Sequence, residues 1–212
     1  MKPMDETSGL RKFREEYQLP ERFILGVTRV DHPGLDHYQE IKDFFPGKNP
    51  ETILRAFILC RDDIPHHLVF AGRRVRDYML HLGFREEDFA RVHFITFVPY
   101  EELPKLYNTA DMSIVPPYYD GCSTTMMEAM ACGCPVITSK TGACPEIGAG
   151  ASLYADPHDP GEFAEKIRLI GNDVNLRNEL KIKCLERAAF FDWRRTAKAT
   201  IDGLARAVRE TN

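Results

Sequence analysis

The sequence lacks the features that mark membrane-spanning, secreted and nucleic-acid-binding proteins. No apolar run in its 212 residues approaches the ~20 residues that span a bilayer. The polar segment 1–16 lacks the apolar core of a secretory signal. A formal net charge of −4 argues against nucleic-acid binding by bulk electrostatics. We therefore expect a globular, cytoplasmic protein.

The cysteines and histidines lack the spacing of metal ligands. The six cysteines include no Cys-x-x-Cys pair. Cys132 and Cys134 straddle a predicted helix end, where their thiols would point in different directions. We expect reduced, buried thiols that pack a helix against a sheet, and no zinc site. His66 and His67 lie where an apolar strand begins, and we expect both to be solvated.

Short apolar runs alternate with helical segments along the chain. The predicted strands are 23–27, 67–71, 92–95, 112–115, 135–138 and 152–155. Asn49 is predicted to cap a helix that has Pro50 at its first position. Strands that alternate with helices predict an α/β fold, a Rossmann-like, doubly wound parallel sheet.

The chain divides into three predicted parts. Residues 1–20 are linker-like, residues 21–190 form one Rossmann-like domain, and residues 191–212 form a C-terminal helical tail. We expect Trp193 to pack the C-terminal helices together. The cations of the last helix also fit a membrane-surface segment, but its modest apolar face favours docking against protein. The sequence leaves membrane association of the parent protein open and gives no support for it.

The most informative segment, 120–137, joins the fourth predicted strand to the fifth. Two carboxylates, Asp120 and Glu128, flank a small turn rich in hydroxyl groups. A strand followed by such a turn and a helix N-terminus suits an anionic group, and a carboxylate just inside the helix suits a sugar diol. Ser123 is also a preferred N-cap residue. The segment predicts a pocket for a nucleotide diphosphate sugar.

Other polar residues fall at the same edge of the predicted sheet. In doubly wound folds the ligand lies beyond the carboxyl ends of the strands, where Arg29 and segments 97–99 and 120–125 fall. Arg29 and Lys48 offer the positive charge that a departing diphosphate needs. Asp111 is interpreted as a turn residue without a role in the site.

Segment 120–137 resembles the pattern Glu-Gly-Phe-Gly-x-x-x-x-Glu-Ala-Met-Ala-x-Gly-x-Pro-Val-Ile of the group 1 (family 4) glycosyltransferases, which have the GT-B fold. Four more stretches resemble that family: 24–29, 47–50, 92–111 and 154–157. The similarity runs from about residue 19 to residue 193 and is to the C-terminal, donor-binding half of such an enzyme.

The resemblance implies a role for each matching residue. The catalytic set would be Asp120, facing the transferred sugar, with Arg29 and Lys48 on the donor diphosphate. The resemblance also implies a donor-binding set: Glu128 on the ribose hydroxyls, backbone amides of Cys122, Ser123 and Thr124 on sugar or phosphate, and Val98 beside the base. It further implies transfer with retention of configuration, without a metal or cofactor.

The chain departs from the family pattern at three places. Asp120 stands where Glu is usual, Thr28 and Ser123 stand where Gly is common, and the loop 30–47 is longer than is typical. The resemblance also places the acceptor site on an N-terminal domain that this chain lacks. We therefore expect the isolated chain to be inactive in transfer. The alternatives are half of a GT-B-like nucleotide-sugar 2-epimerase and a non-catalytic nucleotide-sugar-binding module.

Overall fold

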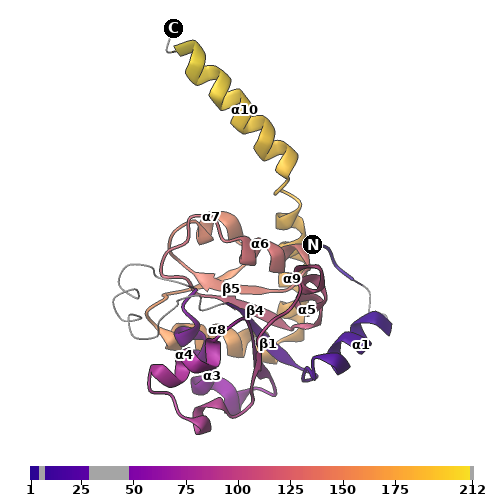
Figure 1. Cartoon of the computed structure of the whole chain (residues 1–212), viewed down its shortest axis with the longest axis vertical. Coiled ribbons are helices and arrows are strands. Elements are labelled where there is room, and N and C mark those ends of the chain that lie inside the picture. The colour runs from indigo at the N-terminus through magenta and orange to yellow at the C-terminus, as the bar shows by residue number, and fades with distance from the viewer. Residues whose placement is uncertain (5–7, 29–47, 211–212) are drawn as a thin grey trace.

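A parallel sheet of six strands forms the centre of the molecule, in the order β3-β2-β1-β4-β5-β6 (Figure 1). The computed structural model describes residues 1–4, 8–28 and 48–210. The strands are β1 (Phe23–Val27), β2 (His67–Ala71), β3 (Val92–Ile95), β4 (Met112–Val115), β5 (Val136–Ser139) and β6 (Leu153–Ala155). The predicted α/β fold is confirmed.

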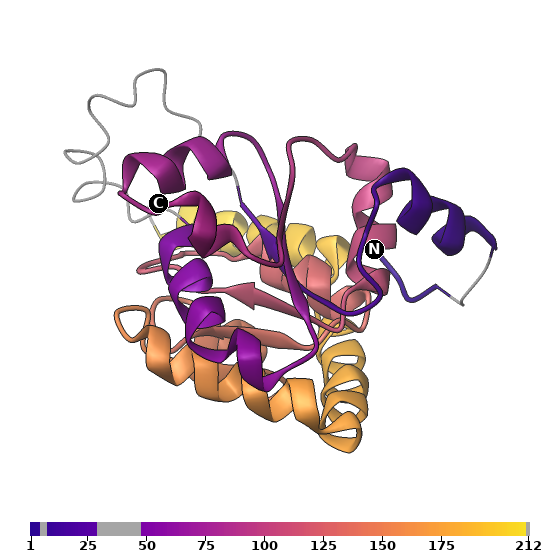
Figure 2. The ribbon, with the colours of Figure 1, turned by 90° about the horizontal axis from the view of Figure 1, so that it is seen from below.

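Helices cover both faces of the sheet (Figures 1 and 2). One face carries α3 (Pro50–Cys60), α4 (Val75–His81) and α8 (Pro160–Asn172). The other carries α1 (Ser8–Glu16), α5 (Leu103–Thr109), α6 (Thr124–Ala131) and α7 (Cys144–Gly148). Helix α9 (Val174–Ala188) packs on both α6 and α8. Short 3-10 turns are η2 (Arg61–Asp63), η3 (Glu86–Phe89) and η4 (Tyr100–Glu102).

Alternation along each strand divides the core into two layers. In β1, Ile24 packs into the layer under α3 and α8, whereas Phe23 and Leu25 pack into the layer under α5 and α6. All three side chains are fully buried. Because successive side chains of a strand point to opposite faces, an unbroken apolar run is needed where both faces are covered.

Side-chain caps fix where several helices begin. Asn49 precedes α3, and its side-chain oxygen accepts a bond from the Thr52 amide at 3.3 Å, as the sequence predicts. Asp159 and Asp173 cap α8 and α9 through their Oδ1 atoms, and Asp173 thereby separates the two helices. Ser123 occupies the N-cap position of α6, but its side chain makes no capping bond.

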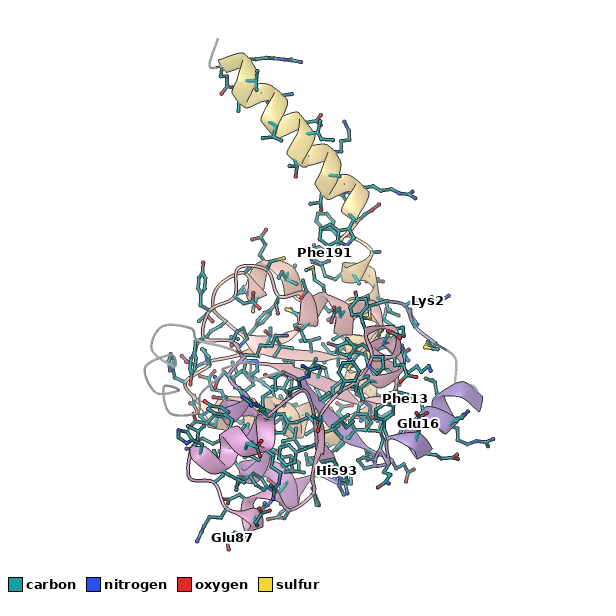
Figure 3. All side chains as sticks on the ribbon, viewed as in Figure 1. Lys2, Phe13, Glu16, Glu87, His93 and Phe191 are labelled. Carbon is teal, nitrogen blue, oxygen red and sulfur yellow. The ribbon has the colours of Figure 1, made fainter. Side chains whose placement is uncertain are left out.

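The last helix, α10 (Trp193–Glu210), projects from the domain with every side chain exposed (Figures 1 and 3). The expectation that Trp193 packs the C-terminal helices is wrong, because its side chain is 84% exposed. No described helix is long and apolar enough to cross a membrane.

Two expectations about buried polar groups also need correction. The expectation that His66 is solvated is wrong: His66 is fully buried, and its Nε2 lies 3.2 Å from the carboxylate of Asp111. Asp111 in turn lies near the guanidinium groups of Arg22 and Arg177, so it organises the start of β4. Five of the six cysteines are buried as expected, but Cys122 is exposed.

Candidate functional site

The candidate site lies at the carboxyl edge of the sheet, around the point where the strand order reverses between β1 and β4. Lys48 precedes α3, and the turn from Asp120 to Ser123 follows β4 and leads into α6. Lys140 and Asp156 follow β5 and β6 at the same edge. The parallel order of the strands therefore gathers polar residues from distant parts of the chain.

Lys48 meets the first turn of α6. Its ammonium donates a hydrogen bond of 2.7 Å to the hydroxyl of Thr125, which lies 77 residues further along the chain. Glu128 follows one turn later on α6, close enough for the charge of Lys48 to favour its ionised form. The structure thus places Lys48 near Glu128, two residues that the sequence analysis predicts to bind the same nucleotide diphosphate sugar.

Tyr107 on α5 contacts the side chain of Glu128. Its buried hydroxyl lies 3.3 Å from Oε2 of Glu128 and 3.4 Å from the carbonyl of Thr125. Burial raises the pKa of Glu128, while the hydrogen bond from Tyr107 and the charge of Lys48 oppose that rise. Burial and the nearby carboxylate raise the pKa of Tyr107 well above its usual value. Tyr107 therefore remains a neutral donor that orients the carboxylate.

Asp120 holds the turn after β4 through its side chain and its carbonyl group. Oδ1 of Asp120 accepts the Cys122 amide at 2.9 Å, and the carbonyl of Asp120 accepts the Ala143 amide at 2.9 Å. Gly142 lies against this turn with a φ of +57°, and a Cβ there would lie 2.6 Å from the Asp120 carbonyl oxygen. The amide of Cys122 is thus already engaged by Asp120, while the carboxylate of Asp120 is fixed at the rim.

Buried hydroxyl groups line this edge without hydrogen-bond partners among the described residues. They belong to Thr28 after β1, Ser123 before α6 and Ser139 at the end of β5. A buried hydroxyl without a partner is unfavourable, so it is normally satisfied by protein, ligand or water. Three such groups at one edge of the sheet fit a site for a polar ligand.

The segment that carries Lys48 is anchored to the far side of the site. The side-chain amide of Asn49 and the hydroxyl of Thr52 both donate to the Pro157 carbonyl, each at 3.1 Å. Beside this anchor, Lys140 pairs with Asp156 at 3.3 Å and with Glu162 at 3.6 Å. Sequence reasoning assigned no role to Lys140, whose only signal is its place directly after a strand.

The remaining predicted residues are placed less fully. Thr124 is exposed at the first position of α6, where its amide has no partner within the helix. Val98 follows β3 and lies half-buried against the core layer that contains α5. Arg29 and the loop 30–47 lie outside the described residues. In the part of the chain that the structure describes, no cluster of three or more His, Cys, Asp or Glu side chains could hold a metal ion.

The strand order and the turn into α6 define a Rossmann-like half of the GT-B type of glycosyltransferase structure. The chain belongs to the glycosyl transferases group 1 family, whose profile matches residues 40–185. The predicted family is therefore confirmed.

Individual relatives agree with this assignment. The O-antigen chain mannosyltransferase B of Escherichia coli is 30% identical over 164 residues, which are 74% of this chain and 42% of that protein. The C-terminal domain of LpcC, a glycosyl transferase group 1 family protein from Francisella tularensis, gives a TM-score of 0.69 at 19% identity, covering 89% of this chain and 94% of that one.

A third relative is HepE from Anabaena, solved in complex with UDP. It gives a TM-score of 0.73 at 18% identity, covering 95% of this chain and 53% of HepE. At such low identity the likeness shows the fold alone. The region matched in the mannosyltransferase is less than half of that protein's length.

Proposed function

We propose that this domain binds the nucleotide diphosphate sugar donor of a retaining glycosyltransferase. The observation that carries the proposal is the hydrogen bond from Lys48 to Thr125 in the first turn of α6, which brings the charge of Lys48 near Glu128 one turn later. The ammonium and the free amides of that turn suit a diphosphate, and Glu128 suits the two ribose hydroxyls.

The arrangement also explains how the domain would aid transfer. As the bond between the sugar and the diphosphate breaks, negative charge accumulates on the departing diphosphate. Lys48 and the N-terminus of α6 stabilise that charge where it forms, and we assign Arg29 as a second cation. Asp120 uses one oxygen to hold the Cys122 amide, and its other oxygen is assigned to a hydroxyl of the transferred sugar.

The finer parts of the proposal follow from the family. Val98 is assigned to the side of the base, and the acceptor to a second domain across a cleft. We propose that transfer retains configuration, requires no metal or other cofactor and takes place in the cytoplasm. The solved complexes of Anabaena HepE with UDP and with UDP-glucose support a nucleotide sugar as ligand.

Calorimetry with UDP, GDP and ADP tests donor binding by the isolated chain. We expect weak, magnesium-independent binding of at least one of them. Lys48→Ala should weaken binding of the nucleotide diphosphate by about 10- to 100-fold. This loss is equivalent to one charge-assisted hydrogen bond of about 1.5–3 kcal/mol. The substitution should affect binding of the nucleoside far less. An unchanged diphosphate affinity would show that Lys48 has a structural role only and does not contact the ligand.

Two conservative variants separate the ends of the ligand. Glu128→Gln should weaken binding of every nucleotide, because the amide lacks the charge that strengthens hydrogen bonds from the ribose hydroxyls. Asp120→Asn keeps an oxygen that can accept the bond from the Cys122 amide. It should therefore leave the affinity for the nucleotide diphosphate unchanged and lower the affinity for the nucleotide diphosphate sugar. Glu186→Gln, on the exposed surface of α9, is the control for a lost carboxylate. If both site variants lose the same affinity for the nucleotide diphosphate as for its sugar conjugate, the two carboxylates have a structural role only.

Turnover distinguishes the enzyme half from a binding module. The isolated 212-residue chain should bind donor yet transfer no sugar to added acceptors, because the proposal assigns the acceptor site to a second domain. Adding the domain encoded upstream, where the parent gene has one, should restore transfer. Sugar transfer by the isolated chain would overturn the assignment of the acceptor site to a second domain.

A further inference from the structure

A separate cavity lies at the opposite edge of the sheet, at the amino ends of β4 and β5. Its volume is about 800 Å³, and its lining includes segments 108–111 and 132–133, which precede those strands. Helices α1 and α9 form its other walls, and both lie on the same side of the molecule as α5 (Figure 1). The volume lies within the ~300–1,000 Å³ range of small-molecule pockets.

The lining of this amino-edge cavity is strongly basic. Arg11 and Arg14 contribute from α1, and Arg177 and Lys181 contribute from α9, whereas Asp111 is the one carboxylate among the described lining residues. The whole chain, in contrast, carries a net charge of −4. A concave surface with an excess of cations attracts anions and raises their local concentration.

Two of the four cations have structural partners. The guanidinium of Arg14 donates to the carbonyls of Pro20, Glu21 and Thr109. Arg177 lies 3.5 Å from Asp111, a carboxylate that already serves Arg22 and His66. Asp111 is therefore not free to neutralise a further charge.

Arg11 and Lys181 are left without such partners. Among the described residues, neither forms a salt bridge, and both side chains are exposed. Lys181 lies one turn after Arg177 on α9, and like charges at this spacing repel each other. Asn178 in the same lining adds a side-chain amide donor, whereas the side-chain amide of Asn108 already donates to the carbonyls of Lys2 and Pro104. Among the residues that the structure describes, the cavity thus presents hydrogen-bond donors together with an excess of positive charge.

We propose that the amino-edge cavity binds a small phosphate-bearing anion, held chiefly by Arg11 and Lys181. This site is separate from the donor site proposed above, although Tyr107 lines the cavity while its hydroxyl contacts Glu128. A soluble phosphorylated compound fits a concave pocket of this size; a phospholipid headgroup has the same chemistry and is the alternative source that the experiment must separate.

Amide NMR shifts on titration with pyrophosphate test the proposal, because they report the two sites separately. Binding in the cavity should shift the amides of Asn108, Gly133 and Asn178, whereas binding at the carboxyl edge should shift Gly121 and Thr124. Lys48→Gln should abolish the second set and spare the first, so the two proposals can fail independently. Higher salt should weaken binding in the cavity.

Variants of the two cations give the decisive comparison. Arg11→Gln and Lys181→Gln should each weaken pyrophosphate binding in the cavity by about tenfold, and Lys181→Arg should preserve it. Lys183→Gln is the matched control, because Lys183 lies on the same helix but pairs with Glu179 at 2.6 Å. The proposal is overturned if the cavity amides do not shift, if Lys183→Gln weakens binding equally, or if only phosphatidylglycerol vesicles, and not pyrophosphate, perturb these amides.

Discussion

Gly142 supports the rim of the candidate donor site, and its replacement by alanine tests the geometry of that rim. Its φ of +57° lies in the left-handed region, which costs a residue with a Cβ about 1–2 kcal/mol. The added Cβ would also lie 2.6 Å from the carbonyl oxygen and 2.9 Å from the amide nitrogen of Asp120. Both are backbone atoms, so no side chain can rotate away to relieve the contact.

The two effects together set the expected magnitude. Displacing a packed turn costs about 1–3 kcal/mol, as in other overpacked sites, so Gly142→Ala should lower the free energy of unfolding by about 2–5 kcal/mol in total. The shift would also break the 2.9 Å bond from the Ala143 amide to the Asp120 carbonyl. Binding of a nucleotide sugar should therefore weaken as the turn moves.

Gly150→Ala is the matched control for this prediction. Gly150 also has a positive φ, +85°, but no atom of the described residues lies within 4 Å of the position that a Cβ would take there. The control should therefore show the backbone effect without the contact. Urea unfolding of both variants measures the difference. If Gly142→Ala is no less stable than Gly150→Ala, the close approach between Gly142 and Asp120 is wrong.

Two further predictions concern titration and thiol reactivity. The rings of His67 and His93 meet at 2.9 Å between nitrogens, and burial lowers the pKa of both. Below pH ~6.5 the unfolded chain then binds more protons than the folded chain, so the free energy of unfolding should fall as the pH drops through the lowered pKa values of the folded state. An unchanged pH dependence of the urea midpoint in a His93→Gln variant would contradict this. Burial raises the pKa of Cys132 to about 11 and of Cys60 and Cys184 to about 12, whereas Cys122 is exposed. A thiol reagent should therefore label Cys122 fast in the native protein, and Cys122→Ser should remove the fast phase while the denatured chain still labels the other five.

The sheet was predictable because its signal is local. Each strand of a sheet covered on both faces is a short apolar run between turn residues, and β1 to β4 have the predicted bounds. Helix α7 was missed because it has five residues, too few for a periodic pattern. The sequence gives little sign of the division between α8 and α9 either, because Asp173 alone separates the two helices.

The site was only partly predictable, because its contacts join distant segments. Sequence position places Lys48 and Glu128 at one edge of the sheet, but it gives no sign that Lys48 bonds to Thr125 or that Tyr107 lies behind Glu128. The prediction that His66 is solvated failed for the same reason, because its contact with Asp111 also joins distant segments. A polar residue before a strand is usually exposed, and only the approach of Asp111 from the start of β4 makes its burial favourable.

Helix α10 divides the thermodynamics of this chain into two processes. None of its residues is buried, so packing against the domain contributes little beyond the contact of Arg195 with Phe190, and Gly203 in its middle lowers its helix propensity further. We expect the sheet and its covering helices to unfold cooperatively, because the same strands contribute side chains to both core layers. The helix–coil equilibrium of α10 is decided instead by local terms such as the pair of Lys198 with Asp202. Helix content measured on the whole chain therefore reports two transitions, and a change in the midpoint of the gradual one carries no information about the stability of the domain.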